Sequence, residues 1–509
     1  MSKASGGGAE VPVVASSPVR VETFGGVVHV EWDPQAAVTP MGQLPFFIDF
    51  LKTADLFEPW VEQCPLRYTS PNAPSKRDVL GTILLSILAG HNRYAHITSI
   101  RADTVNPRLL GMRKVVSEDS ARRAFADTAP AECAKWQQEH LRRCYEPLLY
   151  EPWILDLDST VKPLYGRQEG AVLGYNPHKP GRPSHVLHTY VMANTRLVLD
   201  VEVQPGNQTA GIYGRPGLEM FLDGLGLSAR PKLVRGDVSY GNETIMLACE
   251  ERGQDYLFKL RRSPNVQRLV EQLFLKGEWR GAGSEWEASE SRLQLTGWSC
   301  ERRVIVLRRE LKEQPLLEHK KADGQTELAF VETFDPARRY EYVVLVTSLK
   351  CEQGAMGQMY RDRADSENVN DELKNHWSWG GFTTRDLSRC QVMARHTALF
   401  YNWWSLFTRL AIPERHAEAI TSRPLLLHAV GKETRHSGQV HLTLTSVHGA
   451  WRRARERVTA LAAFLRRVQT NAEQLDWAGR WRLILSRAFQ WFLRGRMLKS
   501  PPLLAGAVP

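Results

Sequence analysis

Residues 359–379 read MYRDRADSENVNDELKNHWSW, a charged stretch with the periodicity of a helix. Tyr360, Arg363, Glu367 and Lys374 stand at offsets 0, 3, 7 and 14 within it. At about 100° per residue, these offsets place the side chains near 0°, 300°, 340° and 320°, on one stripe about 60° wide. A phenol, a carboxylate and two cations in one row could bind a metal ion and phosphates. The alternative is an ordinary solvated helix face with an Arg363–Glu367 pair.

The segment from residue 150 to 260 has the pattern of an α/β domain. Short apolar strands and helical stretches follow one another in the order β-β-β-α-β-α-β. Strands are expected at residues 153–161, 185–193, 197–203, 232–237 and 255–260, and helices at residues 218–227 and 243–252. This order is typical of an α/β sheet, in which a site is expected at the carboxyl ends of the strands.

Two acidic side chains, Asp158 and Asp237, each end one of these strands in apolar company. A carboxylate in such surroundings is costly unless it is paired or binds a cation. Together with Glu367 they would offer the oxygen ligands that Mg²⁺ or Mn²⁺ takes, and two such ions can drive phosphodiester displacement. Asp156, two residues earlier on the same strand face, is the rival for the first position. A single strand-end aspartate could instead cap a turn or a helix.

The bulk composition limits the classes of protein that fit. A chain of 509 residues, 43% of them hydrophobic, has room for about two to four domains. The net charge of +10 is unevenly spread, because residues 385–509 carry 20 Lys and Arg against 7 Asp and Glu. That balance of 20 − 7 = +13 leaves −3 for the first 384 residues. A basic C-terminal quarter suggests a polyanion such as nucleic acid as the partner, and a basic solvated helical surface is the alternative.

The cysteines indicate a reducing compartment, and the hydropathy of the sequence indicates neither a secretory signal nor a membrane span. The seven cysteines are scattered and form no C-x-x-C motif, which argues against a disulfide framework or a zinc ribbon. The N-terminal MSKASGGGAEVPVVASSP lacks the apolar core of a secretory signal, and no window of about 18 apolar residues could span a membrane. We therefore expect a cytoplasmic protein with no membrane partner.

Segments of different texture flank the α/β region. The expected division is a disordered tail at 1–20, a mostly helical DNA-binding domain at 21–149, a core at 150–260 and 351–384, a β-rich insertion at 261–350 and a basic helical region at 385–509. The 21–149 segment opens with a strand or hairpin at Val21–Trp32. Later in it, a helix, a turn and a short helix with Arg122 and Arg123 resemble a helix-turn-helix, although any small helical bundle gives this pattern. C-terminal helices are expected at residues 387–410, 415–422, 450–468 and 477–498.

Three segments together resemble bacterial insertion-sequence transposases of the DDE class, which have an RNase H-like catalytic core. DLDST at residues 156–160 is similar to the strand of the first acid, and VRGDVSY at residues 234–240 is similar to the segment of the second. The four aligned side chains of residues 359–379 match the Y-x2-R-x3-E-x6-K signature of the IS-four-like group. The loop GRQEGAVLGYNPHKPGR at residues 166–182 resembles, more narrowly, the 1380 family of insertion sequences.

The resemblance implies a fold, a chemistry and partners. The fold would be α/β, with an RNase H-like core interrupted by the β-rich insertion and flanked by helical regions. Asp158, Asp237 and Glu367 would be the catalytic triad and would hold two Mg²⁺ ions, with Mn²⁺ as the alternative metal. The partner would be double-stranded DNA, as the inverted repeats of the element and as the target. A homodimer on paired ends, associated with the bacterial nucleoid, is the expected assembly.

Further side chains are expected to contact this DNA. Arg363 and Lys374 would hold phosphates, and Tyr360 would position a phosphate or stack near the cleaved end. Loop and helix residues with the same expected role are Tyr175, His178, Lys179, Arg182, Arg452 and Arg453. For the loop residues the alternative is an ordinary surface loop.

One tryptophan of the β-rich insertion, Trp298, is a candidate for stacking on a flipped base, because the related group uses an aromatic residue there. Trp279 and Trp286 compete for this role. Packing in the insertion's own core is the alternative for each of them.

The function expected from the sequence is that of a DNA transposase. It would bind its inverted repeats, cut the ends by metal-dependent hydrolysis and join the 3′-hydroxyls to target DNA. One alternative is a transposase-derived DNA-binding protein without cleavage, which has no need for three acids in such surroundings. The other is a metal-dependent nuclease without strand transfer, which the sequence separates poorly from a transposase.

Overall fold

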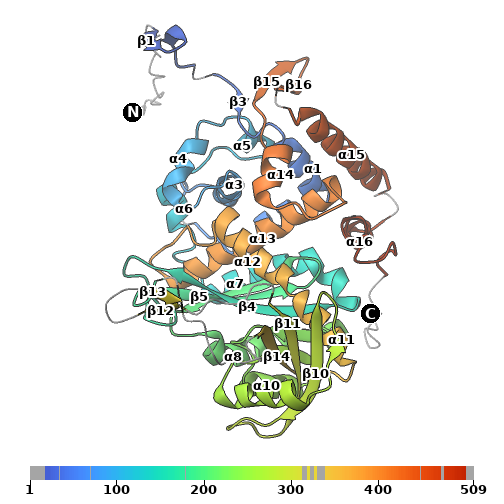
Figure 1. The fold of residues 1–509 in the computed structure, drawn as a ribbon. Coiled ribbons are helices and arrows are strands. Elements are labelled where there is room, and N and C mark those ends of the chain that lie inside the picture. Colours follow the sequence, from blue (N-terminus) through green and yellow to red (C-terminus); the bar gives the residue numbers. More distant parts are fainter. Residues whose placement is uncertain are drawn as a thin grey trace.

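The molecule is built around a nine-stranded mixed β-sheet (Figure 1). The computed structural model describes residues 18–33, 35–68, 70–177, 179–311, 318–320, 326–328, 339–447, 449–471 and 475–499. In spatial order the strands are β6 (Leu197–Pro205), β5 (Ser184–Met192), β4 (Ile154–Pro163), β7 (Leu233–Gly236), β8 (Tyr256–Lys259), β14 (Tyr340–Thr347), β11 (Arg302–Glu310), β10 (Trp286–Leu293) and β9 (Arg280–Gly281). The middle helices are α8 (Ala210–Asp223), α9 (Glu243–Glu251), α10 (Pro264–Lys276), α11 (Gln353–Arg361) and α12 (Ala364–His376).

The first five strands form the expected core. β4, β5 and β6 pair antiparallel in chain order, and β7 and β8 then add parallel to β4 on its other side. Strands β5 and β6 are buried along nearly their whole length, as their near-continuous apolar sequences require. The α/β core predicted from the order of strands and helices is therefore confirmed, with the acid-bearing strands β4 and β7 side by side at its centre.

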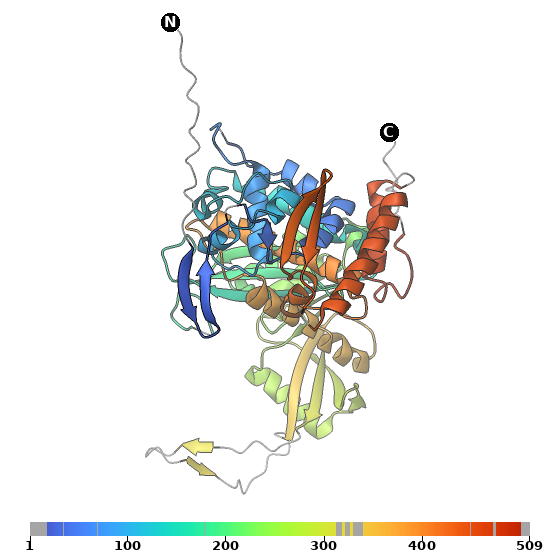
Figure 2. The same ribbon diagram turned by 90° about the horizontal axis from the view of Figure 1, so that it is seen from above.

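The β-rich segment continues the same sheet. β14 pairs antiparallel with β8, β11 with β14, and β10 with β11. The segment is rich in strands, as expected, and a hairpin of β12 (Glu318–Lys320) and β13 (Thr326–Leu328) projects from it (Figure 2). It also contains the helix α10, which the alternating sequence pattern did not predict. A Ser263 cap and Pro264 at the first position start this helix.

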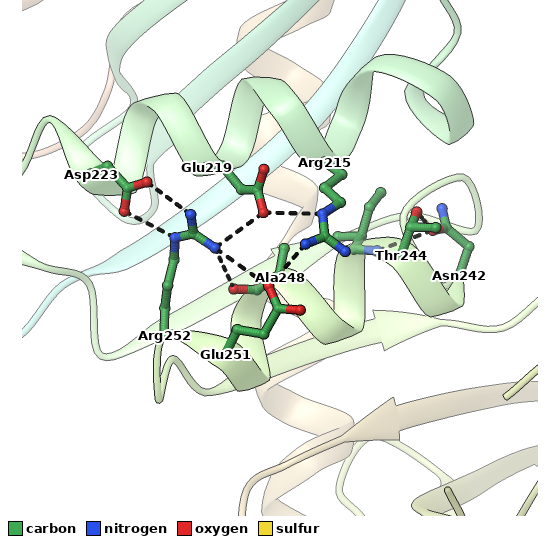
Figure 3. A network of polar contacts seen from close by, with 9 residues as sticks. Arg215, Glu219, Asp223, Asn242, Thr244, Ala248, Glu251 and Arg252 are labelled. Carbon is green, nitrogen blue, oxygen red and sulfur yellow. Dashed lines mark hydrogen bonds and ion pairs between the residues drawn. The ribbon is translucent and has the colours of Figure 1, made fainter. Parts of the chain in front are cut away.

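The helices α8 and α9 are tied together by arginines on their facing surfaces (Figure 3). Arg252, after α9, donates two hydrogen bonds to Asp223 at 2.9 and 2.8 Å and a third to Glu219 at 3.1 Å. Arg215 in α8 bridges Glu219 and Glu251 at 3.0 and 2.9 Å. This network fixes the helix that follows Asp237 against the helix before β7.

Helices from both ends of the chain pack together. The N-terminal helices are α1 (Leu44–Thr53), α2 (Phe57–Glu62), α3 (Lys76–Leu88), α4 (Ile97–Ile100), α5 (Asn106–Leu109), α6 (Glu118–Arg123) and α7 (Pro130–Tyr145). The C-terminal helices are α13 (Leu387–Ala411), α14 (Ala419–Leu426), α15 (Trp451–Thr470) and α16 (Trp477–Ala488). Buried aromatic rings join the two sets, such as Phe47 of α1 and Trp404 of α13, whose centroids are 5.3 Å apart. In the described part of the chain no helix is both long enough and apolar enough to cross a membrane.

Two expectations for the C-terminal region are wrong. The region is not wholly helical, because β15 (Gly431–His436) and β16 (Gln439–Leu444) form a hairpin that also pairs with β3 (Val38–Thr39). The turn Ser437-Gly438 has positive φ at both positions and allows this hairpin. The last helix ends at Ala488 rather than continuing to residue 498, because Phe489 leaves the helical conformation.

Two amide side chains of α13 form hydrogen bonds with the backbone at the outer edge of β6. Asn402 of α13 accepts a hydrogen bond from the Val198 N–H at 2.9 Å and donates one to the Val198 carbonyl at 2.7 Å. Gln391 does the same for the Val203 N–H and the Val201 carbonyl, at 2.6 and 2.7 Å. Two amides of one helix thus satisfy backbone groups that an edge strand would otherwise leave unpaired.

The hairpin predicted near the N-terminus is confirmed. It consists of β1 (Val19–Thr23) and β2 (Gly26–Val30), which pair with each other, and every residue of both strands is exposed. Figure 1 shows β1 standing away from the helices of the molecule. The expected tail at residues 1–20 lies outside the described residues up to residue 17.

Candidate active site

The strand register brings Asp158 and Asp237 together. Leu157 of β4 pairs with Gly236, the last residue of the parallel neighbour β7, so Asp158, the next residue of β4, lies beside Asp237, the first residue after β7. Because β4 continues to Pro163, the expectation that Asp158 ends its strand is wrong. The Asp158 carboxylate accepts hydrogen bonds from its neighbour Ser159 N at 2.9 Å and from Asn370 Nδ2 at 2.7 Å. Burial raises the pKa of Asp158, the Arg363 guanidinium opposes this rise, and the negative charge of Asp237 adds to it. The two acids are therefore close enough to repel each other.

Arg363 lies between two of the predicted triad members. Its Nη2 is 3.4 Å from Asp158 Oδ1, and its Nη1 is 2.8 Å from Glu367 Oε1. Nη2 also donates to the Leu157 carbonyl at 3.2 Å. The arginine side chain is almost fully buried, whereas the Glu367 side chain is 65% exposed. Arg363 thus neutralises the buried acid and holds the exposed one at the rim.

The row of Tyr360, Arg363, Glu367 and Lys374 is carried by two helices rather than one. α11 ends at Arg361, and α12 starts at Ala364 after a turn at Asp362 and Arg363. Tyr360, Arg363 and Glu367 still line one cavity of about 210 Å³, together with the residues Trp286, Leu307, Glu341, Val343, Arg361 and Ala364. Lys374 is exposed further along α12 and does not line this cavity.

Tyr360 lies among the acids. Burial raises the pKa of its hydroxyl to about 12, and the negative charges of Asp237, Glu367 and Asp158 add to the rise while Arg363 opposes it. The phenol therefore stays protonated at neutral pH and can donate a hydrogen bond into this cavity.

The acids fit a divalent metal as a pair. Asp158 and Asp237 offer carboxylate oxygens, the donor type that Mg²⁺ and Mn²⁺ prefer. Among the described residues, however, no group of three His, Cys, Asp or Glu side chains is placed to hold a metal ion, and Glu367 is engaged with Arg363. The assignment of all three acids to one metal centre stays a prediction.

Asp156, the rival first acid, has a different partner. Its side chain is completely buried, and Arg235 of β7 donates to both of its oxygens, at 2.6 and 2.8 Å. Arg235 also donates to the carbonyl of Met359 in α11. Burial raises the pKa of Asp156, and the Arg235 charge opposes this rise. The 17% exposure of the Asp158 side chain, in contrast, leaves one carboxylate of this strand accessible.

Several residues that sequence reasoning missed hold α12 in place. Glu372 is buried and accepts hydrogen bonds from Ala419 N at 2.8 Å, His416 Nε2 at 3.1 Å and Trp377 Nε1 at 3.2 Å. Burial alone would raise the pKa of Glu372, but the hydrogen bond and charge of His416, together with the hydrogen bonds from Ala419 and Trp377, outweigh it and lower this pKa. The available signal was its spacing, because Glu372 stands three residues after the buried Val369.

Two cationic side chains of the loop at residues 166–182 lie over the ring of a tyrosine. Lys179 Nζ lies 4.9 Å and Arg182 Cζ 4.8 Å from the ring centroid of Tyr165, and Lys179 also donates to the Tyr165 hydroxyl. Tyr165 was not singled out in the sequence, although it directly precedes the Gly-rich loop. Tyr175 is exposed, and His178 lies outside the described residues. The structure therefore groups Tyr165, Lys179 and Arg182 on one exposed surface.

The three tryptophans of the β-rich segment lie in different surroundings. Trp298 packs against the main core and lies under Arg302, 5.3 Å from the guanidinium carbon. Trp279 lies under Arg308 at 3.9 Å. Only Trp286, among these three, lines the cavity beside Tyr360. Arg452 and Arg453 are exposed on α15 and do not line this cavity.

Comparison with known proteins gives a family and a structural likeness. The model of the family described as transposase DDE domain group 1 matches residues 67–466. No curated protein matches the chain. Among solved structures, the cryo-EM structure of the piggyBac transposase synaptic complex with hairpin DNA is 12% identical, with a TM-score of 0.39, over 88% of this chain and 86% of that chain.

Proposed function

The chain belongs to the family of transposase DDE domains of group 1, and from this premise we propose a DNA transposase that cuts at the inverted repeats of its element and joins the 3′-hydroxyls to target DNA. Membership implies the use of a divalent metal. Beyond what family membership implies, we propose the kind of element, the metal and the assembly. The element is an insertion sequence of the IS-four-like group, most like its 1380 family; the metal is Mg²⁺, two ions to a site; and the protein works on DNA in the bacterial cytoplasm as a homodimer.

The observation that carries the proposal is the position of Asp158 beside Asp237 where β7 ends, with Arg363 and Glu367 next to them. Asp237 follows the carboxyl end of β7, which is where an α/β sheet places its chemistry, and Asp158 lies beside it within β4. Asp158 and Asp237 would hold the metal, and Glu367 would complete the set once its contact with Arg363 is released. When bound, the metal ions would activate the attacking oxygen and stabilise the leaving one.

The other residues of the row act on phosphate. In the DNA-free chain the Arg363 guanidinium contacts Asp158 and Glu367. In the complex, its planar set of N–H donors can bind a phosphate of the cleaved strand. Tyr360 donates a hydrogen bond from its protonated hydroxyl. Lys374, exposed on the same helix as Glu367, contacts a flanking phosphate as a point charge.

The test is cleavage of a DNA fragment that carries the element's end, with Mg²⁺, by native protein and by Glu367→Gln. This change removes a metal-binding charge with little change in volume. Asp371→Asn is the matched control, because it makes the same acid-to-amide change on an exposed position one turn further along α12. We expect native protein and the control to cut and Glu367→Gln to bind DNA but cut at least about a hundredfold more slowly.

Other outcomes point elsewhere. Equal cutting by native protein and Glu367→Gln would show that Glu367 is not catalytic. Binding without cutting by all three proteins would favour a transposase-derived DNA-binding protein. Cutting without joined products would favour a metal-dependent nuclease.

A further inference from the structure

The hairpin of β1 and β2 has an apolar face that is not covered by any other part of the chain that the structure describes. Its register pairs Val19 with Val30 and Val21 with Val28, so these four valines point to one side. They are 37–48% exposed. Alternation of this kind is typical of a hairpin that packs one face against something. A two-stranded hairpin alone is marginally stable in water, and three or more strands are needed for independent stability.

The charge of the hairpin argues against DNA as the partner. Residues 18–33 contain one arginine, Arg20, against Glu22, Glu31 and Asp33. A surface that binds the phosphate backbone carries the opposite balance. A protein partner with an apolar surface and a complementary strand edge fits these residues.

The outer edge of β1 is complementary to itself. Its sequence, VRVET, is centred on Val21, with Arg20 on one side and Glu22 on the other. Within one chain, Arg20 and Glu22 form an exposed ion pair with each other at 2.6 Å. If β1 pairs antiparallel with β1 of a second copy about Val21, each Arg20 also faces Glu22 of the other chain, and opposite charges directly across a sheet are favourable. The same operation on β2, GVVHV, places no opposite charges across from one another.

The backbone of β1 agrees with this centre. Thr23 and Gly26 close the turn as a pair, and hydrogen-bonded pairs alternate along an antiparallel ladder. Arg20 and Glu22 therefore direct their N–H and C=O groups to the free edge. In the pairing about Val21 these groups meet those of the second copy, and the two Val21 residues face each other as a non-hydrogen-bonded pair, in which side chains lie closest.

We propose that β1 is a self-pairing edge that joins two copies of this chain through a four-stranded sheet in the order β2-β1-β1-β2. The two valine faces then lie on one side of that sheet. Strand addition at an exposed edge is an established mode of association. The inference gives a surface to the homodimer of the proposed function, but it rests on the hairpin alone and needs neither DNA nor metal.

Cysteine cross-linking of the full-length chain tests the register. In a Cys300→Ser background, which removes the exposed cysteine, Val21→Cys is compared with Val28→Cys. The two valines are cross-strand neighbours on the same face, at 40% and 46% exposure. We expect mild oxidation without DNA to give a covalent dimer for Val21→Cys, since its Cα atoms would lie within disulfide range, and at least about tenfold less for Val28→Cys. No dimer, or equal dimer from both, would overturn the proposal.

A charge exchange tests the pairing without cysteines. Arg20→Glu places like charges across the shared edge, and we expect the dimer dissociation constant from analytical ultracentrifugation to rise about tenfold. The double variant Arg20→Glu/Glu22→Arg restores opposite charges and should return the constant to its native value. A double variant as weak as the single one, or a native chain that stays monomeric, would overturn the proposal. DNA cleavage, assayed separately, tests the proposed function, so that either can fail alone.

Discussion

Arg235 holds the buried carboxylate of Asp156 through two hydrogen bonds, Nε to Oδ1 at 2.6 Å and Nη2 to Oδ2 at 2.8 Å. The two residues are neighbours in the parallel register of β4 and β7. Because Arg235 also donates to the Met359 carbonyl, the pair links both acid-bearing strands to the helix that precedes Arg363. The Asp156–Arg235 pair therefore has a structural role, which is to hold the backbone around Asp158 in place. Substitutions of Asp156 and Asp158 should accordingly have different effects.

Asp156→Asn should unfold at a lower temperature than native protein. It leaves the Arg235 charge buried without an ionised partner, which costs about 3–5 kcal/mol. Asp158→Asn, in contrast, should change the thermal midpoint little and abolish DNA cleavage. Melting curves and cleavage rates of the two variants, taken side by side, make the comparison. A stable, inactive Asp156→Asn together with an active Asp158→Asn would reverse the assignment of the first acid.

Arg363→Met should bind Mn²⁺ more tightly than native protein when DNA is absent. The guanidinium now neutralises Asp158 and Glu367 at 3.4 and 2.8 Å, so its removal leaves their charge to attract a cation. We expect about a tenfold gain in affinity by calorimetry, which is the effect of about 1.4 kcal/mol of electrostatic energy. DNA cleavage should fall in the same variant. Arg142→Met is the control, because Arg142 pairs with Glu146 at the end of α7 and does not line the cavity beside Tyr360, so its metal affinity should be native.

Acid should destabilise the fold partly through His396. This ring is fully buried between Trp60, Trp136, Phe125 and Phe400, and its nitrogens have no hydrogen-bond partner among the described residues. Burial lowers the pKa of His396 to about 3, from an ordinary value of 6.5. Between these values the unfolded chain binds a proton that the folded chain does not. The stabilisation is therefore complete above pH 6.5 and is lost as the pH falls, by about 1.4 kcal/mol per pH unit.

His396→Phe should remove this contribution. Its thermal midpoint should fall less steeply than that of native protein between pH 6.5 and 4, while other buried histidines, such as His140, act equally in both. His441→Phe, at an exposed position, should leave the slope unchanged. Equal slopes for native protein and His396→Phe would contradict the burial argument.

The cations on Tyr165 should contribute to DNA binding by neutralising phosphates. Replacing Lys179 and Arg182 by glutamine should weaken binding to DNA of any sequence and reduce the slope of log K against log salt by about 1 for each phosphate that is no longer neutralised. Lys135→Gln, at an exposed lysine on α7, should leave the slope at its native value. The slope is measured by fluorescence anisotropy between low and physiological salt. An unchanged slope in the double variant would place these cations outside the DNA interface.

Most of the secondary structure around the site could be predicted from the sequence, because it depends on patterns within short segments. Strand alternation located β4, β7 and β8, and helical spacing placed Tyr360, Arg363 and Glu367 together. The partner of Asp156 could not be predicted, because it depends on the register between two strands about 80 residues apart. The turn at Arg363 was also missed, since neither glycine nor proline marks it. Burial of Glu372 required knowing that α14 packs on α12.

Hydrogen bonding between β8 and β14 has a consequence for how this chain can be shortened or recombined. β8 is buried, and β14 occupies its outer edge along Leu257, Phe258 and Lys259. A deletion of residues 264–347 would leave that edge open, and an apolar open edge is a template for aggregation. The β-rich segment therefore cannot be exchanged between relatives as a loop graft. A functional chimera must therefore take the β-rich segment and strand β8 from the same parent, and the sheet has to be exchanged as a whole.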